Sequence, residues 1–426
     1  MSPAARIEGA SDSAAPAPLL LGPDRPGVVI HRPGIGAGAI NEPPLRERRF
    51  LALLAVHGDE PCGVVAANRL LAAGFFAAAA ADPSCPFDEL RLVVGNPKAL
   101  AAGVRFLDLN LNRCFKEDVI ANGSSGGSGG TARCGDGVGH AAAGAGGGSN
   151  RSDGGPAPYE AARAAQLAPL IEAAGSVLDI HSTSVPTPPF AFYVPGDSGA
   201  ASAARSSGGG GAASSSAAKA PSLAGAGPAA AEGHGQGQAQ QQQQQQQGGA
   251  QEGVPPEAEL ALSLPVAYVV RDYTGAGQGL AIEWAAAAAA AAGAAVRASC
   301  VECGSHQDPA SVEVAEACLR AFATAGGTRT GEPGSGAAAA PRHVVARSGV
   351  IVRAGFRWLW GGSGSGSGGG GAPPPAFAHV AAGQVVAADD EAGDIACPCA
   401  GGALVFMPAG APRVGEDALL WAEDYP

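Results

Sequence analysis

The feature that most constrains the fold is an apolar run, Arg49 to Val56, that stops abruptly at a histidine and a glutamate. Such a run is typical of a parallel strand covered on both faces, and the segment Pro61 to Ala73 has the pattern of a helix. Proline is favoured at the first helical position and holds the preceding Glu60 away from helical angles. His57 and Glu60 are therefore expected at the carboxyl end of a strand, where open α/β sheets bind ligands. The alternative is that Glu60 caps the helix and His57 only ends the strand.

A second apolar run, Ser176 to Ile180, also ends in a histidine, His181. Two histidines and one carboxylate supply the three protein ligands of a hydrolytic zinc site and leave a fourth position for water. Asp179 lies two residues before His181, hence on the same side of the strand, and is expected to orient a ligand. The alternative for Asp179 is a simple turn former.

Composition excludes several classes of protein. A net charge of −12 argues against a nucleic-acid partner. The longest apolar stretches fall short of the ~20 residues of a membrane span, so no membrane partner is expected. Nine cysteines, an odd number, fit reduced thiols better than a disulfide framework. No charged-then-apolar segment opens the chain, so a cytoplasmic location is expected, with an organellar transit peptide as the alternative.

Strands and helices alternate along most of the chain, which predicts an α/β fold with a mixed, mostly parallel sheet flanked by helices. From Arg342 onward short β-rich runs follow one another, which predicts a smaller C-terminal all-β barrel-sandwich domain. The expected strands are 27–31, 49–56, 90–95, 176–180, 264–271 and 297–303, and the expected helices are 61–73, 160–174, 279–292 and 310–325.

The domain limits follow from composition. Residues 1–25 are expected to be disordered, 26–330 to form the catalytic domain, and 340–426 to form the β domain. Segments rich in Gly, Ser, Ala or Gln cannot build a packed core, so they are expected to be insertions. These segments are 122–158, 199–256 and 361–372.

The segment Asn96 to Phe115 matches neither the helical nor the strand period, and we expect it to be a loop that crosses the site. It contains Arg105, Asn112 and Arg113. Arginine binds carboxylates through two parallel hydrogen bonds, and asparagine adds an amide donor, so these residues predict an anion-binding wall. The alternative is that the arginines are ordinary surface or salt-bridge residues.

Five short motifs follow one another along the chain. They are HGDE at 57–60, NPKA at 96–99, an arginine followed by DLNLNR ending at Arg113, DIH at 179–181 and VECG at 301–304. In this order they resemble the aspartoacylase and succinylglutamate desuccinylase family, which is related to the zinc carboxypeptidases. The resemblance spans about residues 50 to 322 outside the insertions, and it implies a zinc carboxypeptidase-like fold.

The resemblance also implies an activity: hydrolysis of the amide bond of a small N-acyl amino acid, with one Zn²⁺ per chain. Glu302 would be the general base, Arg105 would stabilise the scissile carbonyl, and Asn112 and Arg113 would hold a substrate carboxylate. By motif matching, the zinc ligands would be His57, Glu60 and His181.

The sequence departs from the family pattern in two places. Asn110 stands where the familiar motif has an acidic residue, two positions before Asn112. The tyrosine that aspartoacylases use near their C-terminus has no clear counterpart in the final segment, GEDALLWAEDYP. The C-terminal region also resembles a biotinyl or lipoyl carrier, but such carriers need a lysine and none follows Lys219.

Two further functions remain open from the sequence. One is a zinc carboxypeptidase that acts on short peptides, and the other is an inactive metal-binding regulatory protein. Self-association into a homo-oligomer is also left open.

Overall fold

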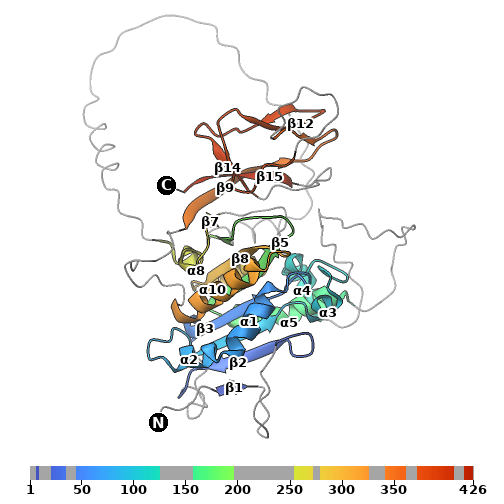
Figure 1. Cartoon of the computed structure of the whole chain (residues 1–426). Coiled ribbons are helices and arrows are strands. Elements are labelled where there is room, and N and C mark those ends of the chain that lie inside the picture. Colours follow the sequence, from blue (N-terminus) through green and yellow to red (C-terminus); the bar gives the residue numbers. More distant parts are fainter. Residues whose placement is uncertain are drawn as a thin grey trace, which may run out of the picture.

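The computed structural model describes residues 6–8, 21–34, 45–124, 157–195, 254–271, 279–325, 341–360, 372–406 and 417–425. The strands of the main sheet are β1 Arg6–Glu8, β2 Gly27–His31, β3 Arg49–Leu54, β4 Glu89–Val94, β5 Ser176–Thr183, β6 Phe190–Tyr193, β7 Tyr268–Arg271, β8 Arg297–Ser305, β9 Arg342–Ile351, β11 His379–Val380, β14 Ala403–Phe406 and β15 Asp417–Asp424. They form one 12-stranded sheet in the order β1-β2-β4-β3-β5-β8-β6-β7-β9-β15-β14-β11 (Figure 1). From β4 to β9, five of the six pairings are parallel, and only β8 with β6 is antiparallel.

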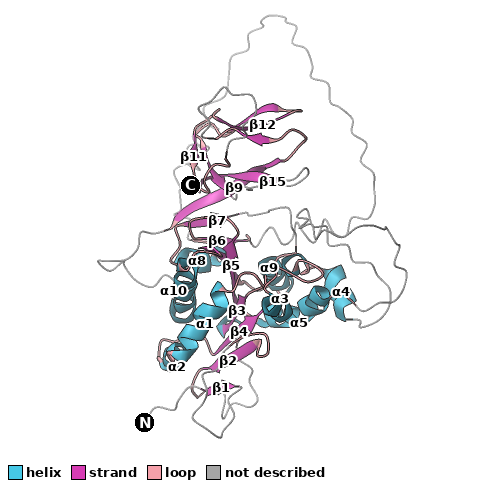
Figure 2. Cartoon of the chain, turned by 45° about the vertical axis from the view of Figure 1, so that its right-hand side comes forward, coloured by secondary structure: helices cyan, strands magenta, loops and turns pink. Residues whose placement is uncertain are grey.

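Helices cover both faces of the parallel part of the sheet, as Figure 2 shows. One face carries α1 Cys62–Ala72, α2 Phe75–Ala81, α8 Pro256–Ser263 and α10 Ala310–Ala325. The opposite face carries α4 Glu117–Ser124, α5 Tyr159–Ala173 and α9 Ala281–Ala291. The described part of the chain also contains three short helices, α3 Pro97–Ala102, η1 Arg46–Arg48 and η2 Leu111–Arg113.

Strand β3 shows why this sheet is apolar on both sides. Successive side chains of a strand point to opposite faces. Phe50 and Leu54 accordingly pack into the core with α1 and α10, whereas Leu51 and Leu53 pack into the core with α5 and α9. A strand with two covered faces needs an unbroken apolar sequence, which this segment has.

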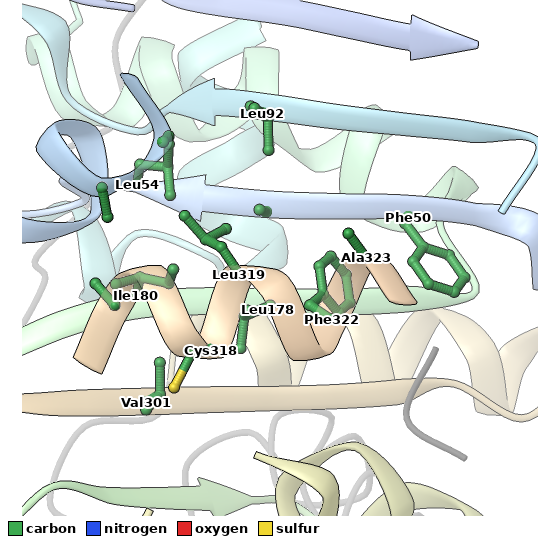
Figure 3. Close-up of a cluster of buried hydrophobic side chains, with 14 of the residues drawn as sticks. Phe50, Leu54, Leu92, Leu178, Ile180, Val301, Cys318, Leu319, Phe322 and Ala323 are labelled. Carbon is green, nitrogen blue, oxygen red and sulfur yellow. The ribbon is translucent and has the colours of Figure 1, made fainter. Parts of the chain in front are cut away.

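Helix α10 supplies much of the first core. Figure 3 shows its side chains lying over strands β3, β5 and β8. The ring of Phe322 lies 5.0 Å from the ring of Phe50 in β3, and both side chains are almost completely buried. The packing fixes the position of these strands, and therefore of the residues at their carboxyl ends.

The C-terminal region extends the sheet and adds a second one. Strand β9 pairs parallel with β7 and antiparallel with β15. The additional three-stranded sheet consists of β10 Arg357–Trp358, β12 Val385–Asp389 and β13 Gly393–Ala396. A separate apolar cluster, which includes Trp358 of β10 and Trp421 of β15, packs the three-stranded sheet against the C-terminal strands of the main sheet.

The predicted fold class is confirmed: the protein has a mixed α/β sheet flanked by helices, with an extra β sheet in the C-terminal region. The main differences lie in the short elements. The segment 96–115, expected to be a loop, contains α3 and η2, and β6 and α8 were not expected. The predicted insertions lie outside the described residues apart from their ends, and the domain limits stay predictions.

Two further expectations concern thiols and apolar helices. Cys300 and Cys303 are buried core residues, as expected, and the cysteines of the described part of the chain are free thiols. Within the described ranges, no single helix is long and apolar enough to cross a membrane. Helices α1 and α2 meet those criteria only together, across a bend of 66°.

Candidate metal centre

The chain makes a tight turn between β3 and α1, and two local features determine its shape. Ala55 has a φ of 49°, a left-handed conformation that is rare outside glycine and is often found near functional sites. Gly58 lies directly against α3, because a Cβ at this position would come within 2.1 Å of the Ala99 carbonyl carbon. The Gly58 amide also donates a hydrogen bond of 3.1 Å to the Arg105 carbonyl. The turn is therefore fixed between α1, α3 and the segment that follows α3.

The turn brings His57 and Glu60 next to His181 of β5. Nδ1 of His57 lies 2.9 Å from Oε1 of Glu60, and Nδ1 of His181 lies 2.8 Å from Oε2 of the same carboxylate. One ligand atom from each of the three residues lies within 4.8 Å of the others, and all three side chains are buried. Strands β3 and β5 are parallel neighbours, so their carboxyl ends meet here.

The second ring nitrogen of each histidine has its own partner. Nε2 of His57 lies 3.0 Å from Oδ1 of Asn110, and Nε2 of His181 lies 3.1 Å from Oδ1 of Asp179. The contact of Asp179 is an ion-pair distance without good hydrogen-bond geometry, since this oxygen has no hydrogen-bond partner among the described residues. Asp179 nevertheless lies where the sequence predicted it, beside a candidate ligand.

The electrostatics of the cluster depend on burial and on the shared carboxylate. Burial alone would raise the pKa of Glu60, but His57 and His181 outweigh it and hold that pKa well below its usual value. Burial lowers the pKa of His57. For His181, burial acts in the same direction, but Asp179 and Glu60 together raise its pKa well above the usual value. Glu60 is thus held as the ionised carboxylate that a metal ligand must be.

Glu302 lies on β8, in register with His181 on the neighbouring strand β5. Its Oε2 is buried and has no hydrogen-bond partner among the described residues. Burial raises the pKa of Glu302 to about 8, while the nearby charge of His181 opposes the rise. A buried carboxyl oxygen without a partner is unusual in a folded protein and marks a candidate for chemistry.

The predicted anion-binding residues occupy different places. Arg105 lies at the rim with its side chain 31% exposed, and its Nη1 donates to Oε1 of Glu60 at 2.8 Å. Asn112 is buried, with Nδ2 3.4 Å from Nε2 of His181. Arg113 is half-buried and donates to the carbonyl of Asn112 at 2.7 Å. The structure therefore brings Arg105 and Asn112 to the cluster directly, and Arg113 only through Asn112.

Sequence reasoning assigned no role to two residues that shape the site, Asn110 and Glu160. Glu160 is completely buried in the first turn of α5, where its carboxylate accepts hydrogen bonds from three consecutive amides, those of residues 107 to 109. It also accepts a bond from Nδ2 of Asn96. Only the apolar character of α5 hinted at this burial, and no sequence pattern marked these partners.

The arrangement can hold a metal ion. Two imidazole nitrogens and a carboxylate, all buried and close together, form the donor set of a catalytic zinc site with room for further ligands. The surroundings also suit catalysis, because Glu302, whose pKa is raised, and Arg105 both lie close to Glu60 and can interact with a substrate there.

Comparisons with known proteins agree with this geometry. The sequence profile of the succinylglutamate desuccinylase/aspartoacylase catalytic domain matches residues 48–127, a segment that contains His57, Glu60 and Arg105. The comparison with curated proteins found no significant match.

Solved structures of two succinylglutamate desuccinylases are similar to this chain. That of Vibrio parahaemolyticus is 13% identical, with 94% of this chain and 87% of the other covered and a TM-score of 0.50. That of Vibrio cholerae is 12% identical, with 94% and 86% covered and a TM-score of 0.50. At these identities the likeness shows a shared fold. Together with the profile match, it shows that this chain is similar to these proteins in fold and, over residues 48–127, in sequence to the succinylglutamate desuccinylase/aspartoacylase catalytic domain.

Proposed function

We propose that the protein is a zinc-dependent hydrolase that cleaves the amide bond of a small N-acyl amino acid. The observation that supports this best is the convergence of His57, Glu60 and His181 beside Glu302, whose Oε2 is buried without a partner. Metal ligands alone would suit a storage or structural site. A poised carboxyl group next to them is what hydrolysis requires.

The donor set suits one zinc ion per chain. His57 and His181 would provide nitrogen ligands, and Glu60 would provide a carboxylate oxygen. When bound, zinc supplies Lewis acidity, which activates water and polarises a carbonyl group. Structural zinc sites have four protein ligands, whereas three leave a position for water or substrate.

Glu302 would act as the general base and then as the general acid. Its Oε2 would accept a proton from the attacking water and pass it to the leaving amine, so that the carboxyl group ends the cycle as it began. The raised pKa of Glu302, about 8, comes from burial and suits the second step, in which it must release the proton to an amine. A cation held by the neighbouring ligands would lower that pKa and favour the first step.

The arginines and Asn112 would bind the substrate. Arg105 reaches the cluster from the rim, so its guanidinium is placed to turn from Glu60 to a developing negative charge on the scissile carbonyl. Asn112 and Arg113 would hold the carboxylate of the amino acid, since a guanidinium and an amide together match its two oxygens. The family match and the names of the two Vibrio proteins agree with a small acylated amino acid as the substrate class.

A substrate screen with purified, zinc-loaded protein tests this proposal. N-acetyl, N-succinyl and N-formyl amino acids are assayed beside dipeptides, and release of the free amine is measured. Hydrolysis of at least one acyl amino acid is expected. Glu302→Gln is expected to keep zinc and to lose about 10²- to 10⁴-fold in turnover.

Three results would contradict the proposal. Cleavage of dipeptides alone would identify a carboxypeptidase instead. Bound zinc with no turnover of any substrate would favour a regulatory metal protein. Loss of zinc in Glu302→Gln would make Glu302 a ligand and not a base.

A further inference from the structure

The two candidate ligand histidines lie against chemically different partners. Nε2 of His181 faces a carboxylate, that of Asp179, at 3.1 Å. Nε2 of His57 faces a neutral amide, that of Asn110, at 3.0 Å. Both partners are buried, so water does not screen the difference between them.

The orientation of the Asn110 amide is determined by a second hydrogen bond. The backbone amide of Asn112 donates to Oδ1 of Asn110 at 3.0 Å. Only the oxygen of a side-chain amide can accept, so the oxygen and not the nitrogen must face this donor. The same oxygen lies 3.0 Å from Nε2 of His57, so the hydrogen bond from the Asn112 amide also determines which atom of Asn110 faces His57.

This orientation determines which ring nitrogen of His57 is available to a metal. An acceptor opposite Nε2 needs a proton on Nε2, whereas Nδ1 faces the ionised carboxylate of Glu60 at 2.9 Å, where a cation would take the place of a shared proton. Nδ1 is the atom that lies 2.9 Å from Oε1 of Glu60, whose other oxygen contacts Nδ1 of His181. Asn110 therefore prepares His57 to bind a metal through Nδ1.

Asn110 is itself held rigidly. The carboxylate of Glu160 accepts hydrogen bonds from the backbone amides of Leu107, Asp108 and Leu109 at 2.7, 3.0 and 3.0 Å, and these bonds fix the three residues before Asn110. Oδ2 of Asp108 accepts a hydrogen bond of 2.9 Å from the backbone amide of Tyr159. The segment before Asn110 therefore both donates hydrogen bonds to the start of α5 and accepts one from it. A fixed acceptor can impose a tautomer, whereas a mobile one cannot.

We propose that Asn110 is a positioning residue that presents Nδ1 of His57 to the metal, and that its neutral amide holds the metal more weakly than a carboxylate would. The inference rests on the proposed zinc centre and deepens it. A carboxylate that accepts from a ligand histidine makes the other ring nitrogen a stronger donor, and partners of this kind change metal affinity by about 10- to 100-fold. This chain has a carboxylate at ion-pair distance behind His181, and only a neutral amide behind His57.

Zinc affinity measured without substrate tests the inference. The zinc dissociation constant is determined by competition with a chromophoric chelator for the wild type, Asn110→Asp and Asn110→Ala. Asn110→Asp is expected to bind zinc about 10- to 100-fold more tightly, and Asn110→Ala about 10- to 100-fold more weakly. Asn122→Asp, which adds the same charge on α4, is the matched control and should stay within about twofold of the wild type.

Nitrogen NMR of histidine-labelled, zinc-loaded protein provides a second readout. The ring of His57, assigned by comparison with His57→Gln, should carry its proton on Nε2 in the wild type, and Asn110→Ala should show a mixture of rings protonated on Nε2 and on Nδ1. Asn110→Asp has the same shape as the wild type and keeps the test valid if Asn110→Ala does not fold.

Wild-type affinity in Asn110→Asp, or a proton on Nδ1 of His57 in the wild type, would overturn the inference. Neither result depends on turnover, so each would leave the deacylase proposal standing. Conversely, the expected affinity changes in a protein that hydrolyses no acyl amino acid would support the role of Asn110 and refute the proposed activity.

Discussion

Replacement of Glu302 by glutamine should change how the stability of the metal-stripped protein depends on pH. Folded protein keeps the Glu302 proton up to about pH 8, because burial raises the pKa, whereas the usual pKa of a glutamate is 4.5. Between these values the folded state binds more protons than the unfolded chain. The free energy of unfolding therefore falls as pH rises through this window. Glutamine has the shape of the protonated side chain but does not titrate.

The size of the effect follows from the two pKa values. The rise from 4.5 to about 8 spans about 3.5 pH units. At about 1.4 kcal/mol per unit, the wild type should lose up to about 5 kcal/mol relative to Glu302→Gln. The two proteins should be similarly stable near pH 4.5, differ by roughly 3 kcal/mol at pH 7 and differ most above pH 8.

Urea denaturation at several pH values measures this difference. Both proteins are treated with a chelator first, because a bound cation would lower the pKa of Glu302. Glu313→Gln, at an exposed position of α10, is the control, and its difference from the wild type should stay within about 1 kcal/mol at every pH. A difference between the wild type and Glu302→Gln that stays constant from pH 5 to 8.5 would refute the assignment of a raised pKa to this carboxyl group.

Three further substitutions probe the surroundings of the site. Arg113→Ala should mainly raise KM for acyl amino acids, because it removes binding present in ground and transition states alike, and an unchanged KM would exclude Arg113 from the pocket. Gly58→Ala would place a Cβ 2.1 Å from the carbonyl carbon of Ala99 and should lower the free energy of unfolding by about 1–3 kcal/mol, whereas Gly22→Ala, with nothing within 4 Å, should change it little. Glu160→Gln replaces one acceptor oxygen by a donor among buried amides and should lower the free energy of unfolding by about 1–3 kcal/mol. Denaturation curves that match the wild type would contradict the stabilising role of the hydrogen bonds from residues 107 to 109 to Glu160.

Much of the fold was predictable because buried parallel strands have a strong sequence signal. Strand β2 and helix α10 begin and end at the residues expected from the sequence, Gly27–His31 and Ala310–Ala325. His57 and His181 were found because each follows an apolar strand, and parallel neighbours bring their carboxyl ends together. Glu302 was predicted from the VECG motif, and it lies on β8, which pairs with β5 in register at His181.

The residues that were missed depend on contacts between distant parts of the chain. Glu160 binds amides that lie 51 to 53 positions earlier, across a low-complexity segment, and no periodicity records such a pairing. Asn110 was noticed only as a departure from a motif, and its contact with His57 spans 53 positions. Short elements such as β6, with four residues, are set by pairing with their neighbours and hardly by local propensity.

The predicted roles of Arg105 and Asp179 are compatible with their positions but rest on different contacts from those expected. Arg105 forms an ion pair with Glu60, so a substrate carbonyl would have to compete with that carboxylate for the guanidinium. Asp179 contacts Nε2 of His181 while Asn112 approaches the same nitrogen at 3.4 Å. The anion-binding segment and the histidines therefore form one connected network, in which a change at any member is expected to affect metal binding as well as substrate binding.

Metal stoichiometry measured by native mass spectrometry tests the central claim most directly. The wild type should bind one zinc ion per chain, and the triple substitution of His57, Glu60 and His181 by alanine should abolish binding. The free thiols of the core are a second potential source of zinc binding, and the comparison between the two proteins separates them from the proposed centre. One zinc ion that is lost in the triple variant is the result we predict, and equal zinc content in both proteins would contradict the account.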